Sequence, residues 1–209
     1  MQQLPAIDPA KTALNYHHNP EQVEAHGEQH PDHRMLGIIV FLGSEGMIFF
    51  GMFAAYLIYR AMAPAWPPEG TPARELLLPG INTLILISSS FVIHNADTAI
   101  KKNDAAGMRN WLIATIIMGV VFLCGQVYEY THLEFGLTTN IYASCFYVLT
   151  AFHGLHVTFG VLLMSGVVWR SRAPGHYSSE HHFGVEATEL YWHFVDVIWI
   201  ILFVLLYIL

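Results

Sequence analysis

The sequence is short of charged residues, and of basic residues in particular. Charged residues make up 12% of the 209 positions, against about 25% in an ordinary soluble domain. Lys and Arg are missing from Asn110 to Trp169 and again from Ala173 to Leu209. These gaps exclude the basic surface that nucleic-acid binding needs. They indicate that lipid surrounds most of the chain.

Cysteine is nearly absent as well. Cys124 and Cys145 both fall in apolar stretches, so two buried, unpaired side chains are favoured over a disulfide. Neither cysteine has a histidine at ligand spacing, which argues against a copper electron-transfer site.

Apolar residues are abundant and fall into five runs. A helix needs roughly 20 residues to cross ~30 Å of hydrocarbon. Five runs are long enough: Leu36–Tyr59, Ile81–Ala99, Trp111–Tyr130, Ile141–Trp169 and Ala187–Leu209. The sequence therefore predicts an all-α, polytopic membrane bundle of five transmembrane helices over residues 35–209.

The first 34 residues form a polar segment without an apolar run, so we interpret them as a tail and not as a signal peptide. Its histidines could bind a metal only adventitiously; they are His17, His18, His26, His30 and His33.

The distribution of basic residues predicts the orientation. With the N-terminus in the cytoplasm, seven of the nine Lys and Arg residues lie in cytoplasmic segments, leaving Arg60 and Arg74 outside. The positive-inside rule favours this arrangement. Five spans then place the C-terminus outside.

Acids and histidines interrupt the predicted spans, where they are costly and normally face the bundle interior. In the last span, steps of three, four and three residues place four of them on one helical face. We expect a buried polar network that joins the helices by hydrogen bonds. Its predicted members are His94, Gln126, Glu129, His153, His156, Glu186, Glu189, His193 and Asp196.

Glu45 is a single acid near the middle of the first span. Glycines on this span, at Gly37, Gly43, Gly46 and Gly51, are suited to close helix packing. So deep in hydrocarbon, the carboxyl group should be largely protonated. It is then either a structural hydrogen-bond donor or a member of a proton relay, and the spacing leaves both interpretations open.

Histidine spacing offers a different interpretation. His153 and His156, with His181 and His182, weakly resemble the histidine boxes of intramembrane di-iron hydroxylases, and His193 is a further candidate ligand. The paired boxes are too few, and no nucleophile–base pair or phosphate-binding loop occurs. We therefore predict no catalytic residue and no metal or cofactor ligand in this chain. A proton-coupled transporter centred on Glu45 is a third interpretation.

Three tracts resemble subunit III of the haem–copper cytochrome c oxidases. They are Ala151-Phe-His-Gly-Leu-His-Val157, His181-His-Phe-Gly-Val-Glu-Ala187 and Tyr191-Trp-His-Phe-Val-Asp-Val-Ile-Trp199. The resemblance extends from about Arg34 to the C-terminus. Longer family members have seven helices, with a lipid-filled cleft between the first two and the other five, so this chain resembles a short, five-helix bacterial form.

This resemblance implies a non-catalytic subunit of a terminal oxidase that reduces O2 to water and pumps protons. Haem and copper are then expected in subunits I and II, and phospholipid is the candidate ligand of this chain. Subunit I is the implied main contact, with subunit II and a small helical subunit as further partners, in a bacterial plasma or thylakoid membrane. Glu45 matches the family's carbodiimide-reactive glutamate.

Overall fold

Five long helices make up most of the computed structural model, which describes residues 33–72, 76–173 and 175–209. The helices are α2 (His33–Met62), α3 (Leu77–Lys101), α4 (Ala105–His132), α5 (Ile141–Arg170) and α6 (Phe183–Phe203), which continues as a short π-helix, η3 (Val204–Ile208). No strand occurs in the described ranges. All five helices are long and apolar enough to cross a membrane, which confirms the predicted bundle.

The chain divides into two units, Met1–His33 and Arg34–Leu209, and the second holds the bundle. Apart from its last two residues, the predicted tail lies outside the described residues. Arg74, expected on the outer side, lies outside them too.

The helices extend beyond the predicted apolar runs. α4 begins at Ala105 and not at Trp111, because Asp104 caps it and accepts a hydrogen bond from the backbone N–H of Gly107 at 2.8 Å. α6 begins at Phe183 and not at Ala187. A hydropathy criterion misses such terminal turns because their residues are more polar than the spans that they extend.

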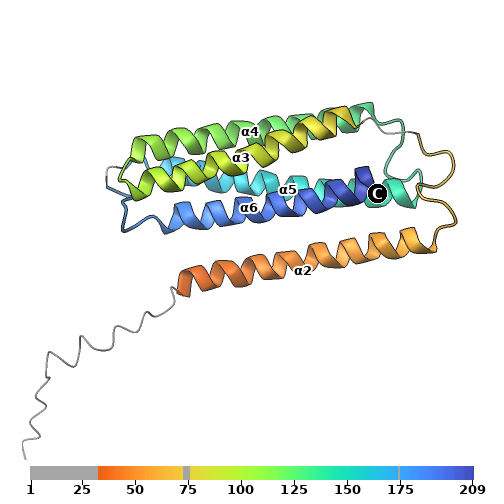
Figure 1. Cartoon of the computed structure of the whole chain (residues 1–209), viewed down its shortest axis with the longest axis horizontal. Coiled ribbons are helices and arrows are strands. Elements are labelled where there is room, and N and C mark those ends of the chain that lie inside the picture. Colours follow the sequence, from red (N-terminus) through yellow and green to blue (C-terminus); the bar gives the residue numbers. More distant parts are fainter. Residues whose placement is uncertain (1–32, 73–75, 174) are drawn as a thin grey trace, which may run out of the picture. The chain divides into compact units, whose positions relative to one another are not determined.

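A short turn joins α3 to α4 and holds these two helices side by side (Figure 1). Asn103 in this turn has a φ of 58°, a left-handed conformation that asparagine tolerates. Its side-chain oxygen accepts a hydrogen bond from the backbone N–H of Ser179 at 2.8 Å. The turn is thereby tied to the loop that leads into α6.

α6 is the most buried helix of the bundle. Half of the apolar, membrane-spanning stretch of α6 is buried, against 17% of the corresponding stretch of α2. The indole N–H of Trp192 donates to the Ser89 hydroxyl at 2.8 Å, and that of Trp199 donates to the Thr83 hydroxyl at 2.9 Å. Both acceptors lie on α3, so these two bonds join α6 to α3 and satisfy two buried donors.

Two glycines make room for the Trp192 ring. A Cβ atom at Gly160 on α5 would lie 2.7 Å from a ring atom, and one at Gly119 on α4 would lie 2.8 Å from it. Only a residue without a side chain allows α4 and α5 to contact the ring at these points.

α2 lies apart from the other four helices (Figure 1) and reaches them through long side chains. Phe49 packs against Phe152 and Phe194. The hydroxyl of Tyr56 donates to the backbone oxygen of Leu205 at 2.8 Å. The predicted close packing is therefore wrong at Gly37, Gly43 and Gly51, where a Cβ atom would meet open space. At Gly46 a Cβ atom would lie 3.6 Å from the Phe194 ring of α6, an ordinary contact.

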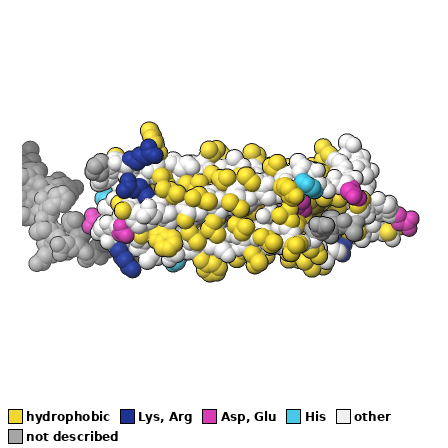
Figure 2. Space-filling view, turned by 90° about the horizontal axis from the view of Figure 1, so that it is seen from above, with side chains coloured by type: hydrophobic (Ala, Val, Ile, Leu, Met, Phe, Trp, Pro, Cys, Tyr) yellow, Lys and Arg dark blue, Asp and Glu magenta, His cyan; other side chains and the backbone are white. Residues whose placement is uncertain are grey.

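The lipid-facing surface is apolar along the length of the bundle. Hydrophobic side chains cover the face in Figure 2, and the Lys and Arg side chains gather mainly at one end. Cys124 and Cys145 are free, as predicted, but Cys124 is exposed and Cys145 half-buried, so the expected burial of both is wrong.

Replacing Gly160 with Ala should destabilise the bundle by ~1–3 kcal/mol, because the new methyl group collides with the buried Trp192 ring. Thermal unfolding in detergent, followed by circular dichroism, measures the loss. Gly166→Ala on the same helix is the matched control, since its Cβ meets open space. Equal loss of stability in both variants would contradict this account of the core.

Candidate functional site

A glutamate–histidine pair connects α2 to α5. The Oε2 atom of Glu45 lies 3.1 Å from Nε2 of His156. The other ring nitrogen of His156, Nδ1, lies 2.8 Å from the backbone oxygen of Phe152. A carbonyl oxygen can only accept, so Nδ1 carries a proton.

Because Nδ1 carries a proton, only two hydrogen-bonding arrangements remain between Nε2 and the Glu45 carboxyl group. In one arrangement a protonated Glu45 donates to a neutral ring; in the other an imidazolium donates to a carboxylate. In both cases one proton lies between the two side chains. The side chains are largely buried, at 21% exposed for Glu45 and 9% for His156.

This pair lies in the wall of an apolar groove between α2 and α5. The hollow around it has a volume of about 420 Å³ and is lined mainly by Phe41, Ile48, Phe152, Leu155 and Phe159. Two further hollows adjoin these helices: one of about 500 Å³ that α6 also lines, and one of about 250 Å³ lined by α2 and α5 alone. We call these three hollows the α2–α5 groove.

Polar side chains mark one end of the α2–α5 groove. Arg170 and Tyr177 line its largest hollow. Burial raises the pKa of the Tyr177 phenol, against a smaller opposite effect from Arg170, so the phenol remains a neutral hydrogen-bond donor. A cation and a neutral donor therefore stand at the end of an otherwise apolar groove.

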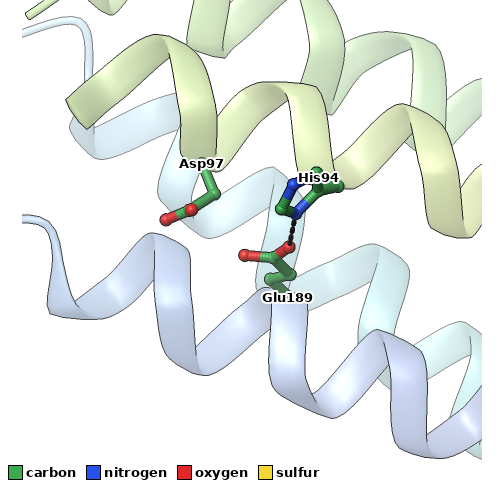
Figure 3. A group of neighbouring side chains, drawn as sticks. All are labelled: His94, Asp97 and Glu189. Atoms are coloured by element: carbon green, nitrogen blue, oxygen red, sulfur yellow. Dashed lines mark hydrogen bonds and ion pairs between the residues drawn. The ribbon is translucent and has the colours of Figure 1, made fainter. Parts of the chain in front are cut away.

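A second group of polar side chains follows the contact between α3 and α6, and we call it the α3–α6 seam. Figure 3 shows three of its members, His94 and Asp97 from α3 and Glu189 from α6. Glu189 lies 2.9 Å from Nδ1 of His94 and 3.4 Å from Nε2 of His193. These contacts bring together His94, Glu189 and His193, which the sequence predicted as members of one polar network.

The α3–α6 seam continues further along α6. Nδ1 of His193 lies 3.1 Å from the hydroxyl of Ser90, and that hydroxyl donates to the carboxylate of Asp196. The seam is not uniformly buried, because the His94 side chain is 65% exposed and that of His193 is 40% exposed. The expectation of burial is therefore wrong for these two histidines.

The opposite end of the seam contains residues that the predicted network omitted. Lys101 Nζ lies 2.6 Å from Asp97 and 4.0 Å from Glu186, which in turn lies 3.1 Å from Nε2 of His182. The spacing of Asp97 and Lys101, four residues apart in one helix, is a signal that could have identified the first pair.

The other predicted network residues lie elsewhere. Gln126 donates to Glu129 at 3.0 Å, and the hydroxyl of Tyr207 donates to the same carboxylate at 2.8 Å. The fully buried ring of His153 lies 3.3 Å from the backbone oxygen of Val195 and packs against Trp199. The contacts of Tyr207 and His153 join helices, whereas the Gln126–Glu129 bond lies within α4. The predicted residues therefore fall into several groups instead of one network.

The histidines do not converge as an iron site requires. His153 contacts α6, His156 contacts α2 and His193 contacts α3. Among the described residues, the side-chain groups spaced for a metal ion contain His94 or His182, and none contains His153, His156, His181 or His193. The di-iron interpretation therefore has no support in the geometry.

These features define a polytopic helical membrane protein whose intramembrane acids and histidines contact one another. Residues 22–209 match the family model described as cytochrome c oxidase subunit III, and the chain belongs to this family. It is an integral membrane protein of the haem–copper oxidases.

Several curated relatives support the family assignment. Cytochrome c oxidase subunit 3 of a Synechocystis strain is 66% identical over 187 residues, which cover 89% of this chain and 80% of the relative. The protein of the same name from Thermostichus vulcanus is 64% identical over 184 residues, covering 88% and 91%. The human protein is 38% identical over 178 residues, covering 82% and 67%.

Replacing His193 with Leu should weaken retention of this chain in its complex by ~1–3 kcal/mol, because Glu189 and Ser90 each lose a partner. The yield of the chain after purification of the complex measures the effect. Val197→Leu, at an exposed position of the same helix, should leave the yield unchanged. A normal yield from His193→Leu would refute the structural role of the seam.

Proposed function

We propose that this chain is the non-catalytic subunit III of a haem–copper terminal oxidase and that it supports proton uptake and the stability of the complex. The Glu45–His156 pair is the observation that carries this proposal. It holds one proton between two helices, in a part of the groove whose other lining residues are mainly apolar.

The contacts of the pair favour a proton-holding role over a purely structural one. Transfer of the shared proton from Glu45 to His156 gives a carboxylate and an imidazolium, and the reverse transfer restores the neutral pair. The exchange needs no movement of the backbone, since the two atoms already lie 3.1 Å apart. We assign the redox chemistry, with haem and copper, to subunits I and II.

The α2–α5 groove is the proposed binding site for a phospholipid. Its lining is apolar over three successive hollows, which suits an acyl chain. Arg170 at one end offers a guanidinium group that matches a lipid phosphate. α2 supplies one wall of this groove, so the short form of the family needs no additional helix to bind lipid here.

The proposed orientation places the end of the bundle with Lys101 and Arg170 in the cytoplasm. α3 and α5 both end there, and most of the basic side chains visible in Figure 2 gather at one end. The main proposed partner is subunit I of the oxidase, with subunit II and a small helical subunit as further contacts.

Replacing Glu45 with Gln should keep the hydrogen bond to His156 but remove the exchangeable proton. We expect normal haem and copper contents of the complex and slower proton uptake during turnover in lipid vesicles. Glu69→Gln, at an exposed position outside the helices, is the matched control. A large loss of haem would contradict the non-catalytic assignment, whereas normal proton uptake would leave Glu45 as a structural donor only.

A further inference from the structure

A cluster of metal-ligating side chains lies at the end of the α3–α6 seam, and the proposed function does not use it. Asp97 from α3, with His182 and Glu186 from the start of α6, each place one ligand atom within 4.8 Å of the others. Asp97 also belongs to a neighbouring group with His94 and Glu189 (Figure 3). Asp97 is therefore common to both groups.

Asp97 has a buried oxygen atom without a partner. Its side chain is 4% exposed, and Oδ2 contacts the Lys101 ammonium group at 2.6 Å. Oδ1 is buried and has no hydrogen-bond partner among the described residues. A buried carboxylate oxygen in this state is costly unless a proton donor or a cation reaches it.

His182 is oriented as a metal-binding histidine would be. Its Nδ1 atom lies 3.1 Å from the backbone oxygen of Ser178, which can only accept, so Nδ1 carries a proton. In the neutral ring the lone pair is then on Nε2. A backbone carbonyl that fixes the tautomer in this way is the usual outer partner of a ligating imidazole.

The lone pair of His182 points at another acceptor. Nε2 lies 3.1 Å from Oε1 of Glu186 and makes no hydrogen bond with the described residues. Two facing acceptors repel each other unless a second proton or a metal ion lies between them. The same cation would also lie within reach of the Asp97 carboxylate.

We propose that Asp97, His182 and Glu186 form a binding site for a non-redox divalent cation, with Zn²⁺ as the ion that fits best. One imidazole nitrogen and two carboxylates are ligands that zinc accepts, and water can fill the fourth position. Two carboxylates balance the charge of the ion. This site departs from the sequence-based expectation that the chain holds no metal ligand.

Lys101 competes with the ion for the same carboxylates. Its ammonium group lies 2.6 Å from Asp97 and 4.0 Å from Glu186. The Lys101 side chain is 53% exposed, so it can move into solvent when the ion binds. Glu186 is 34% exposed, which gives the ion a route into the site.

The neighbouring group is a weaker candidate. Nδ1 of His94 already lies 2.9 Å from Glu189, and this histidine is 65% exposed. Glu189 also contacts His193 at 3.4 Å. The ligand atoms of His94 and Glu189 are therefore already in contact with other side chains, whereas Nε2 of His182 has no hydrogen-bond partner among the described residues.

Zinc binding to the purified oxidase complex tests this proposal. We would dialyse the complex against buffered free Zn²⁺ and measure bound zinc by mass spectrometry, after replacing the tail histidines with Gln in every variant. We expect one zinc per chain. Asp97→Asn and His182→Gln should weaken binding by more than about tenfold. His181→Gln, at the exposed neighbouring histidine, should bind as the parent does.

A third variant separates a zinc site from a purely structural cluster. Lys101→Met removes the competing positive charge, so zinc should bind roughly tenfold more tightly. The haem content and retention of the chain confirm that each variant assembles. If Asp97→Asn does not assemble, His182→Gln and Lys101→Met decide the result. Equal zinc binding by the parent and His182→Gln, or no tightening in Lys101→Met, would overturn the proposal.

Discussion

The hydrocarbon core of a membrane offers no hydrogen-bonding partner, and the rest of this structure depends on that constraint. α6 satisfies it by directing the indole N–H groups of Trp192 and Trp199 at hydroxyl groups of α3. Gly119 and Gly160 leave the space that the first ring needs. The two buried indole donors of α6 are thereby satisfied within the bundle, and α2 contacts the bundle through side chains.

The two sides of this core differ in chemistry. On the α2 side, a single proton lies between Glu45 and His156, within an apolar groove that suits a lipid chain. On the α3 side, several acids and histidines contact one another and are partly exposed. The first side suits a subunit that helps protons and lipid reach an oxidase. The second suits contact with ions and with neighbouring subunits.

Local features of the sequence predicted the bundle well, because hydropathy and helical spacing act over short distances. The steps between Glu186, Glu189, His193 and Asp196 placed them on one face, and all four contact α3 side chains. The α2–α5 groove could not be predicted, since it depends on how far apart two helices lie. The glycines around Glu45 instead predicted close packing of this helix, which the structure does not show at Gly37, Gly43 and Gly51.

The central claim is that this chain supports a redox complex without holding a redox metal. The iron and copper content of the chain, separated from its partners in mild detergent and dialysed against a chelator, tests it most directly. The account predicts substoichiometric amounts of both metals. One or more tightly bound iron or copper ions per chain would contradict it, and the intramembrane histidines would then be the active site.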